Sequence, residues 1–134
     1  MSYDLDNQNI IDFWIESSNH DYQTMLDLLH TKNYVWALFI GHLVIEKLLK
    51  AYYVKVHRDY PPMLHDLRRI GEKAGISFDD NKLILVETIS QFNIRTRYDD
   101  YKRSFYKLCT PEFTNIWIEN IKEIRLWIQT MLSS

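Results

Sequence analysis

The sequence of 134 residues predicts an all-α protein, an up-and-down four-helix bundle with one additional short helix. Apolar residues recur every three or four positions along most of the chain, as they do in amphipathic helices. No alternating strand pattern of useful length is present, and only 3 Gly and 3 Pro interrupt the chain. The length and the absence of linkers or repeats predict a single domain over residues 1–134.

The first two helices are the most strongly periodic. Apolar positions run through Ile11–Leu29 and then through Tyr34–Tyr52, and neither segment contains Pro. A Thr-Lys-Asn break separates them. Thr31 or Asn33 is expected to cap the second helix, because short polar side chains accept hydrogen bonds from first-turn N–H groups.

The short helix is expected between residues 61 and 75. Pro61 and Pro62 are predicted to end the second helix and to begin the short one, since proline is tolerated in a first turn. Gly75 is a natural C-terminal stop. Ser77, three residues before Asp80, predicts the start of the next helix through a capping box.

The last helix has the clearest start signal. Thr110, Pro111 and Glu112 supply a cap, a first-turn proline and an acid at the positive end of the helix dipole. The apolar stripe then continues to Met131. The aromatic and basic stretch from Tyr98 to Cys109 is compatible with a loop or with continued helix.

Charge is unevenly distributed, although the net charge is only −2. Residues 1–31 hold six acids and no Lys or Arg, whereas residues 47–73 hold seven bases against three acids. Residues 91–110 hold five bases against two acids. Ion pairs between helices are the favoured interpretation, and a basic face for a polyanion is the alternative.

Several classes of protein are not expected. The single cysteine, Cys109, excludes an internal disulfide and a multi-cysteine zinc site. No signal peptide or apolar run of membrane-spanning length is seen, so a soluble, cytoplasmic protein without a membrane partner is predicted. Gly-rich phosphate loops are absent, and no cofactor or metal is expected.

Three local patterns occur in order along the chain. The first is a helix carrying Glu46, Lys47 and Lys50 in a Glu-Lys-x-x-Lys-Ala core. The second is a Pro-Pro turn that opens into the sequence His65-Asp66-Leu67. The third is a helix end with the sequence Arg97-Tyr98-Asp99.

Together these patterns resemble the HEPN family, higher eukaryote and prokaryote nucleotide-binding domains, over residues 10–131. The resemblance implies a five-helix domain built on a four-helix bundle, and a homodimer. In many bacterial members it also implies a small nucleotidyltransferase partner in a toxin–antitoxin pair. Many other members are metal-independent ribonucleases that carry an Arg, four to six residues and a His.

This chain departs from the ribonuclease pattern. Four residues separate Arg97 from Lys102, where the pattern has His, and His65 is the last histidine in the sequence. Arg58 and His65 match the spacing across the Pro-Pro turn, which we attribute to chance. We therefore favour a non-enzymatic dimeric module that binds a nucleotidyltransferase, RNA or nucleotide. The alternative is a ribonuclease toxin with an altered active site.

The candidate contact residues alternate cations with aromatic rings, a pattern that suits single-stranded nucleic acid because bases stack on rings while cations hold phosphates. The alternative is a helix end with a buried tyrosine and an aromatic packing surface. The candidates are Arg95, Arg97, Tyr98, Asp99, Lys102 and Arg103.

The other motif residues have structural alternatives that we favour. Glu46 and Lys50 are spaced for a helix ion pair, and Lys47 and Lys50 are expected to pair with acids rather than to hold a phosphate. A metal site at His42 and Glu46 lacks enough ligands. His65 and Asp66 are expected in the first turn of the short helix, His65 hydrogen-bonding across the bundle.

Overall fold

The computed structural model describes the backbone of residues 2–134 and the side chains of residues 6–98 and 100–134. Over these residues it contains six helices and no strand, which confirms the all-α prediction. The helices are α1 (Ser2–His30), α2 (Tyr34–His57), α3 (Leu67–Lys73), α4 (Asp80–Arg97), α5 (Asp99–Leu108) and α6 (Pro111–Leu132).

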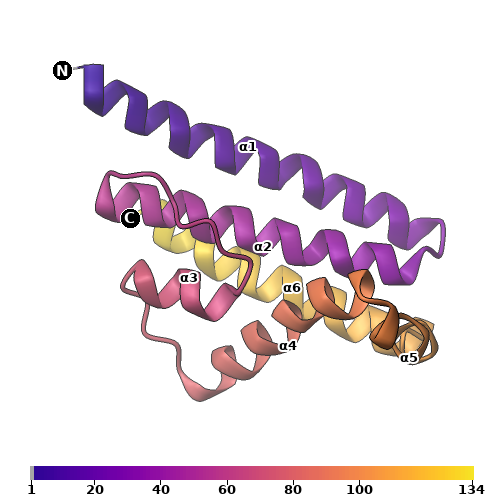
Figure 1. Ribbon diagram of the computed structural model, residues 1–134. Helices are drawn as coiled ribbons and strands as arrows, with labels where there is room; N and C mark the ends of the chain where they lie inside the picture. The colour runs from indigo at the N-terminus through magenta and orange to yellow at the C-terminus, as the bar shows by residue number, and fades with distance from the viewer. Residues whose placement is uncertain (1) are drawn as a thin grey trace.

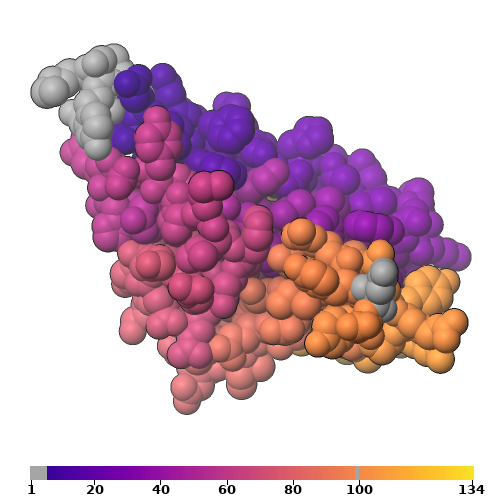
Figure 2. Space-filling model, viewed as in Figure 1, coloured from indigo at the N-terminus to yellow at the C-terminus, as the bar shows by residue number. Residues whose placement is uncertain are grey.

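Helix α2 is the centre of the fold. The long helix α1 packs antiparallel along one side of it, and α3, α4 and α6 contact its other sides (Figure 1). Residues from Ala37 to Val54 of α2 are buried around most of its circumference, as expected for an apolar helix surrounded by partners. The space-filling view shows α3 and α5 toward opposite ends of one face, below α1 (Figure 2).

Close packing in the bundle depends on a glycine of α2. A Cβ atom at Gly41 would lie 2.5 Å from Cδ1 of Ile121 in α6 and 3.1 Å from Sδ of Met25 in α1. The missing side chain therefore allows three helices to approach one another. Leu38, Ile45 and their neighbours extend this fully buried core toward α4.

Three helices begin with a side-chain cap, and α2 does not. Thr110 Oγ1 accepts a hydrogen bond from the Phe113 N–H at 3.2 Å, which confirms the predicted start of α6. Asp66 and Asp79 cap α3 and α4 in the same way. Asn33 precedes α2 but makes no cap bond, and its Nδ2 donates to Thr31 Oγ1 at 2.8 Å.

Two predicted helix starts are wrong. Pro61 and Pro62 lie in the loop of residues 58–66 and do not begin the short helix, which starts after Asp66. His65 therefore lies before that helix and not in its first turn. Asp79, not Ser77, caps α4, because its carboxylate accepts from the Lys82 N–H at 2.8 Å.

The stretch after Arg97 forms an additional helix, so the bundle carries two short helices where one was predicted. Tyr98 adopts an extended conformation (φ −101°, ψ 129°) that ends α4 and redirects the chain into α5. Its side chain is 56% exposed, which contradicts the alternative of a buried tyrosine at this position. Within the described residues, no helix is both long and apolar enough to cross a bilayer.

Candidate functional site

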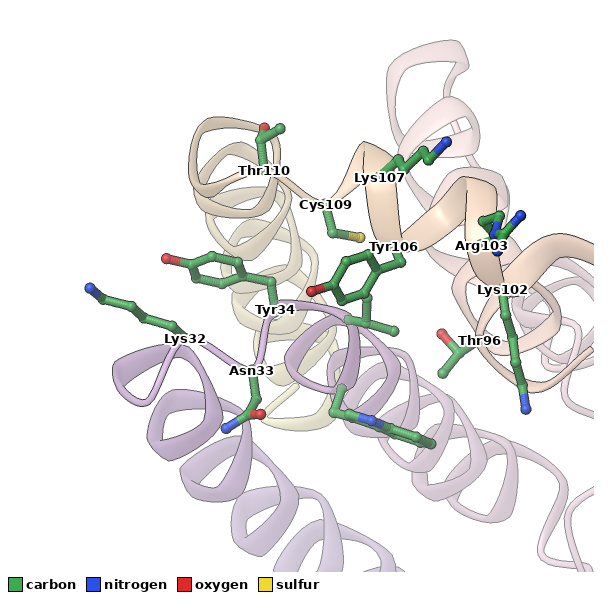
Figure 3. A pocket seen from close by; sticks show the side chains of 12 residues that line it. Lys32, Asn33, Tyr34, Thr96, Lys102, Arg103, Tyr106, Lys107, Cys109 and Thr110 are labelled. Carbon is green, nitrogen blue, oxygen red and sulfur yellow. The ribbon is translucent and has the colours of Figure 1, made fainter. Parts of the chain in front are cut away.

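A pocket of about 960 Å³ opens where the corner between α1 and α2 meets α5 and the start of α6 (Figure 3). We call it the basic aromatic pocket. Its lining residues are Lys32, Asn33, Tyr34, Val35, Trp36, Thr96, Lys102, Arg103, Tyr106, Lys107, Cys109 and Thr110. Segments some sixty positions apart in sequence thus form one surface.

The charged side chains that line the pocket are all positive. Lys32, Lys102, Arg103 and Lys107 contribute four cations, and the lining contains no Asp or Glu. Among the described side chains, neither Arg103 nor Lys107 makes an ion pair. The positive charge of Arg103 and Lys107 favours an anionic ligand in this pocket.

Aromatic rings are exposed beside these cations. Trp36 is 52% exposed and Tyr106 is 76% exposed, although both are large side chains. Trp36 is fixed by an edge-to-face contact with Phe39, with ring centroids 5.7 Å apart. Tyr34 lies close by at the start of α2 (Figure 3). These rings can stack on planar groups of a ligand.

Two polar features of the pocket lack protein partners. Helix α2 starts without a side-chain cap and without an acid in its first turn. Thr96, only 3% exposed, has no hydrogen-bond partner for its Oγ1. Buried hydroxyl groups are normally paired, so an unpaired one in the wall of a pocket is unusual.

The structure brings only part of the predicted contact surface to this pocket. Lys102 and Arg103 line it, whereas Arg95 lies over the Phe105 ring at 5.0 Å. The Arg97 guanidinium donates to Asn93 Oδ1 at 3.2 Å, within α4.

Two further candidates are not among the lining residues. Tyr98 is exposed elsewhere, and the side chain of Asp99 lies outside the described residues. No histidine lines the pocket.

A second polar group of residues, the Glu46 cluster, comprises His42, Glu46, Lys50 and His65. Glu46, only 4% exposed, accepts from Lys50 Nζ at 3.0 Å, as predicted for the helix pair. Its other oxygen lies 2.9 Å from Nδ1 of His65. Lys50 also lies over the Trp14 ring of α1, 5.4 Å from the centroid.

The fourth member, His42, is completely buried. Its Nε2 lies 3.0 Å from the His65 carbonyl oxygen, and its Nδ1 has no partner. Burial, which disfavours the charged imidazolium, lowers the pKa of His42 below its usual 6.5. The cluster therefore fastens the loop of residues 58–66 to α2.

The remaining motif residues have structural contacts. Lys47 Nζ lies 2.6 Å from Asp21 Oδ2 and donates to Ser17 Oγ at 2.8 Å, so its predicted pairing with the acidic first helix is confirmed. Asp66 caps α3. Among the described side chains, no group of three or more His, Cys, Asp or Glu is arranged to hold a metal ion.

Sequence reasoning missed the contribution of the α1–α2 corner. The spacing of the segment Lys32–Trp36 indicates only a break with a possible cap, and nothing in the sequence singles out Thr96. A signal was present, since a tyrosine and a tryptophan stand in a first helical turn that carries no acid. Their proximity to Lys107 follows from the tertiary fold alone.

Comparisons with known proteins agree with this architecture. The model of the HEPN domain matches residues 11–131 of the chain. The fold is similar to that in the crystal structure of TT1696 from Thermus thermophilus, with a TM-score of 0.74 and 16% sequence identity. The match covers 90% of this chain and 96% of that one. No curated protein sequence matches. The family match spans most of the chain, which therefore belongs to the HEPN domain family.

Proposed function

We propose that this HEPN chain binds single-stranded RNA in the basic aromatic pocket and does not cut it. The observation that carries the proposal is the composition of the lining, in which Lys32, Arg103 and Lys107 lie beside two exposed rings and no Asp or Glu is among the lining residues. Single-stranded nucleic acid is bound by this combination, in which cations track phosphates while bases stack on aromatic faces.

The same residues argue against cleavage. Metal-free RNA hydrolysis needs a group that moves a proton near neutral pH, and the lining holds no histidine. Arg97, at the family's arginine position, is hydrogen-bonded to Asn93 outside the lining. The alternative, a ribonuclease with an altered site, would have to use Lys102 in place of the usual histidine.

The proposal also names the protein partners of the chain. We infer that the chain acts as a homodimer and that a small nucleotidyltransferase is the competing partner, as its family resemblance implies. The exposed cations of the pocket favour RNA as the ligand of this site. A protein that occupied the same pocket would need a strongly acidic surface to match it.

The test is binding of a fluorescently labelled oligouridine, followed by anisotropy. Tyr106→Ala is expected to weaken binding by roughly 5- to 100-fold, the range for loss of one base stack. Tyr60→Ala is the matched control, because this tyrosine is also 76% exposed but lies in the loop of residues 58–66. Equal effects of the two substitutions would contradict a stacking role for the pocket.

Cleavage is checked on the same oligonucleotide by denaturing electrophoresis. The proposal predicts intact RNA after prolonged incubation with the wild-type protein. Cutting that Lys102→Ala abolishes would instead establish the altered ribonuclease.

A further inference from the structure

Resting on the proposed RNA binding, a more specific inference concerns which part of the RNA occupies the pocket. We propose that the pocket holds a terminal phosphate monoester, the phosphorylated end of a single-stranded RNA, between the N-terminus of α2 and Thr96. Four features of the lining support this assignment.

The first feature is the start of α2. First-turn N–H groups have no partner within a helix, and together with the helix dipole they attract anions. In α2 no side-chain cap bond satisfies them, and the first turn carries no acid. Asn33, Tyr34, Val35 and Trp36 all line the pocket, so this helix end faces it.

The second feature is independent of the helix end. Thr96 comes from the last turn of α4, lines the same pocket and is only 3% exposed. Its Oγ1 has no hydrogen-bond partner among the residues whose side chains the structure describes. A hydroxyl can donate one hydrogen bond to a phosphate oxygen, which would satisfy this group.

The third feature is the charge supplied by α5. Arg103 and Lys107 lie one helical turn apart and form no ion pair with a described residue, and Lys102 extends on the side of the pocket that holds Thr96 (Figure 3). Two or more cations match a dianion better than a monoanion. The positive N-terminus of α2 adds to the same potential.

The fourth feature is the balance of donors and acceptors. The lining offers backbone N–H groups, a hydroxyl, ammonium groups and a guanidinium, and it contains no carboxylate. A phosphate monoester presents three acceptor oxygens and close to two negative charges at neutral pH, whereas an internal phosphodiester carries one charge. A recess rich in donors therefore suits the end of a nucleic acid better than its interior.

Two substitutions test this arrangement without weakening the fold. Asn33→Asp places a carboxylate at the start of α2, where it caps the N–H groups, repels phosphate and stabilises the helix. Asn81→Asp is its control, adding the same charge to the first turn of α4, fifteen residues before Thr96 on that helix.

Thr96→Val removes the unpaired hydroxyl while keeping the side-chain shape. Its control is Thr114→Val, since Thr114 is also buried with an unpartnered Oγ1 but does not line the pocket. We do not expect Asn33→Asp or Thr96→Val to lower the midpoint of thermal unfolding. The first adds a helix cap, and the second removes a buried hydroxyl that has no hydrogen bond.

The measurement compares one oligouridine carrying a 5′-phosphate, a 3′-phosphate or neither, with uridine monophosphate as a competitor. A phosphate at one of the ends is expected to increase affinity about tenfold or more. Asn33→Asp and Thr96→Val should each remove most of that increase, which is measured for each variant as the ratio of its affinities for the phosphorylated and the unphosphorylated RNA. The two control variants should keep the increase.

The outcomes separate this inference from the proposed function. If all three RNAs bind equally well, or if the phosphate effect survives in both pocket variants, the inference is overturned while RNA binding stands. If uridine monophosphate competes as well as the phosphorylated RNA, the ligand is a free nucleotide and not an RNA end. If no RNA binds, both fail.

Discussion

The Nδ1 atom of His65 lies 2.9 Å from Oε1 of Glu46, joining the loop of residues 58–66 to a carboxylate buried in α2. The other Glu46 oxygen accepts from Lys50 at 3.0 Å. A single buried carboxylate thus neutralises one lysine and positions one loop. Loss of this carboxylate should destabilise the protein, because the Lys50 ammonium would remain buried without its counter-charge.

We expect Glu46→Ala to destabilise the protein by about 3–5 kcal/mol, since it leaves the Lys50 ammonium buried without its counter-charge. Urea unfolding measures the change. The double substitution Glu46→Leu with Lys50→Met removes both charges and should cost less than Glu46→Ala alone. A double variant less stable than the single one would contradict this account of the cluster.

Stability should fall in mildly acidic solution because of His42. Burial lowers the pKa of this histidine, which Glu46, His65 and Lys50 face, so the unfolded chain binds a proton more readily than the native protein. The contribution of neutral His42 is complete above about pH 6.5 and is lost as pH falls toward the lowered pKa. His42→Gln should reduce the loss of unfolding free energy between pH 7.5 and 5.5, whereas exposed His20→Gln should leave it unchanged.

Gly41→Ala should destabilise the bundle by about 1–3 kcal/mol through overpacking, despite the better helix propensity of alanine. The added Cβ would collide with Cδ1 of Ile121 at 2.5 Å. Ile121→Val removes that atom, so the double variant should lose less stability than the sum of the two single changes. Strict additivity in thermal unfolding would show that this contact does not limit the packing.

The single thiol should be unreactive in the native protein. Burial raises the pKa of Cys109 to about 11, an effect that the nearby Arg95 partly opposes. Because the thiolate is the reactive form, alkylation by iodoacetamide at pH 8 should be about 100-fold slower in the native protein than after unfolding in guanidinium chloride. Similar rates in the two states would contradict a buried, protonated thiol.

Much of the fold could be predicted from local sequence, because helix periodicity and the Thr110-Pro111 start are local signals. The start of α3 could not, since the side chain of Asp66 competes with Pro61 and Pro62 as the start signal, and its capping bond determines the outcome. The separate helix α5 depends on the extended backbone at Tyr98, which no spacing of apolar residues encodes.

The candidate site was predictable in part. Lys102 and Arg103 were found because they lie among aromatic residues in sequence. Arg95 and Arg97 share that segment, but the helical geometry turns them toward Phe105 and Asn93 instead. Trp36 and Thr96 come from other helices, so their place in the pocket depends on tertiary packing.

The most direct test of RNA binding in the basic aromatic pocket is its dependence on salt. Arg103→Ala with Lys107→Ala removes two exposed cations one turn apart in α5, and Arg69→Ala with Lys73→Ala removes the same pair, equally spaced, in α3. We predict that the α5 variant binds oligouridine more weakly. The fall of the logarithm of the association constant with the logarithm of the salt concentration should become shallower by about 1.4, the value for two lost phosphate contacts on single strands. The α3 variant should match the wild type. Equal effects of the two pairs, or no effect of either, would contradict binding at this pocket.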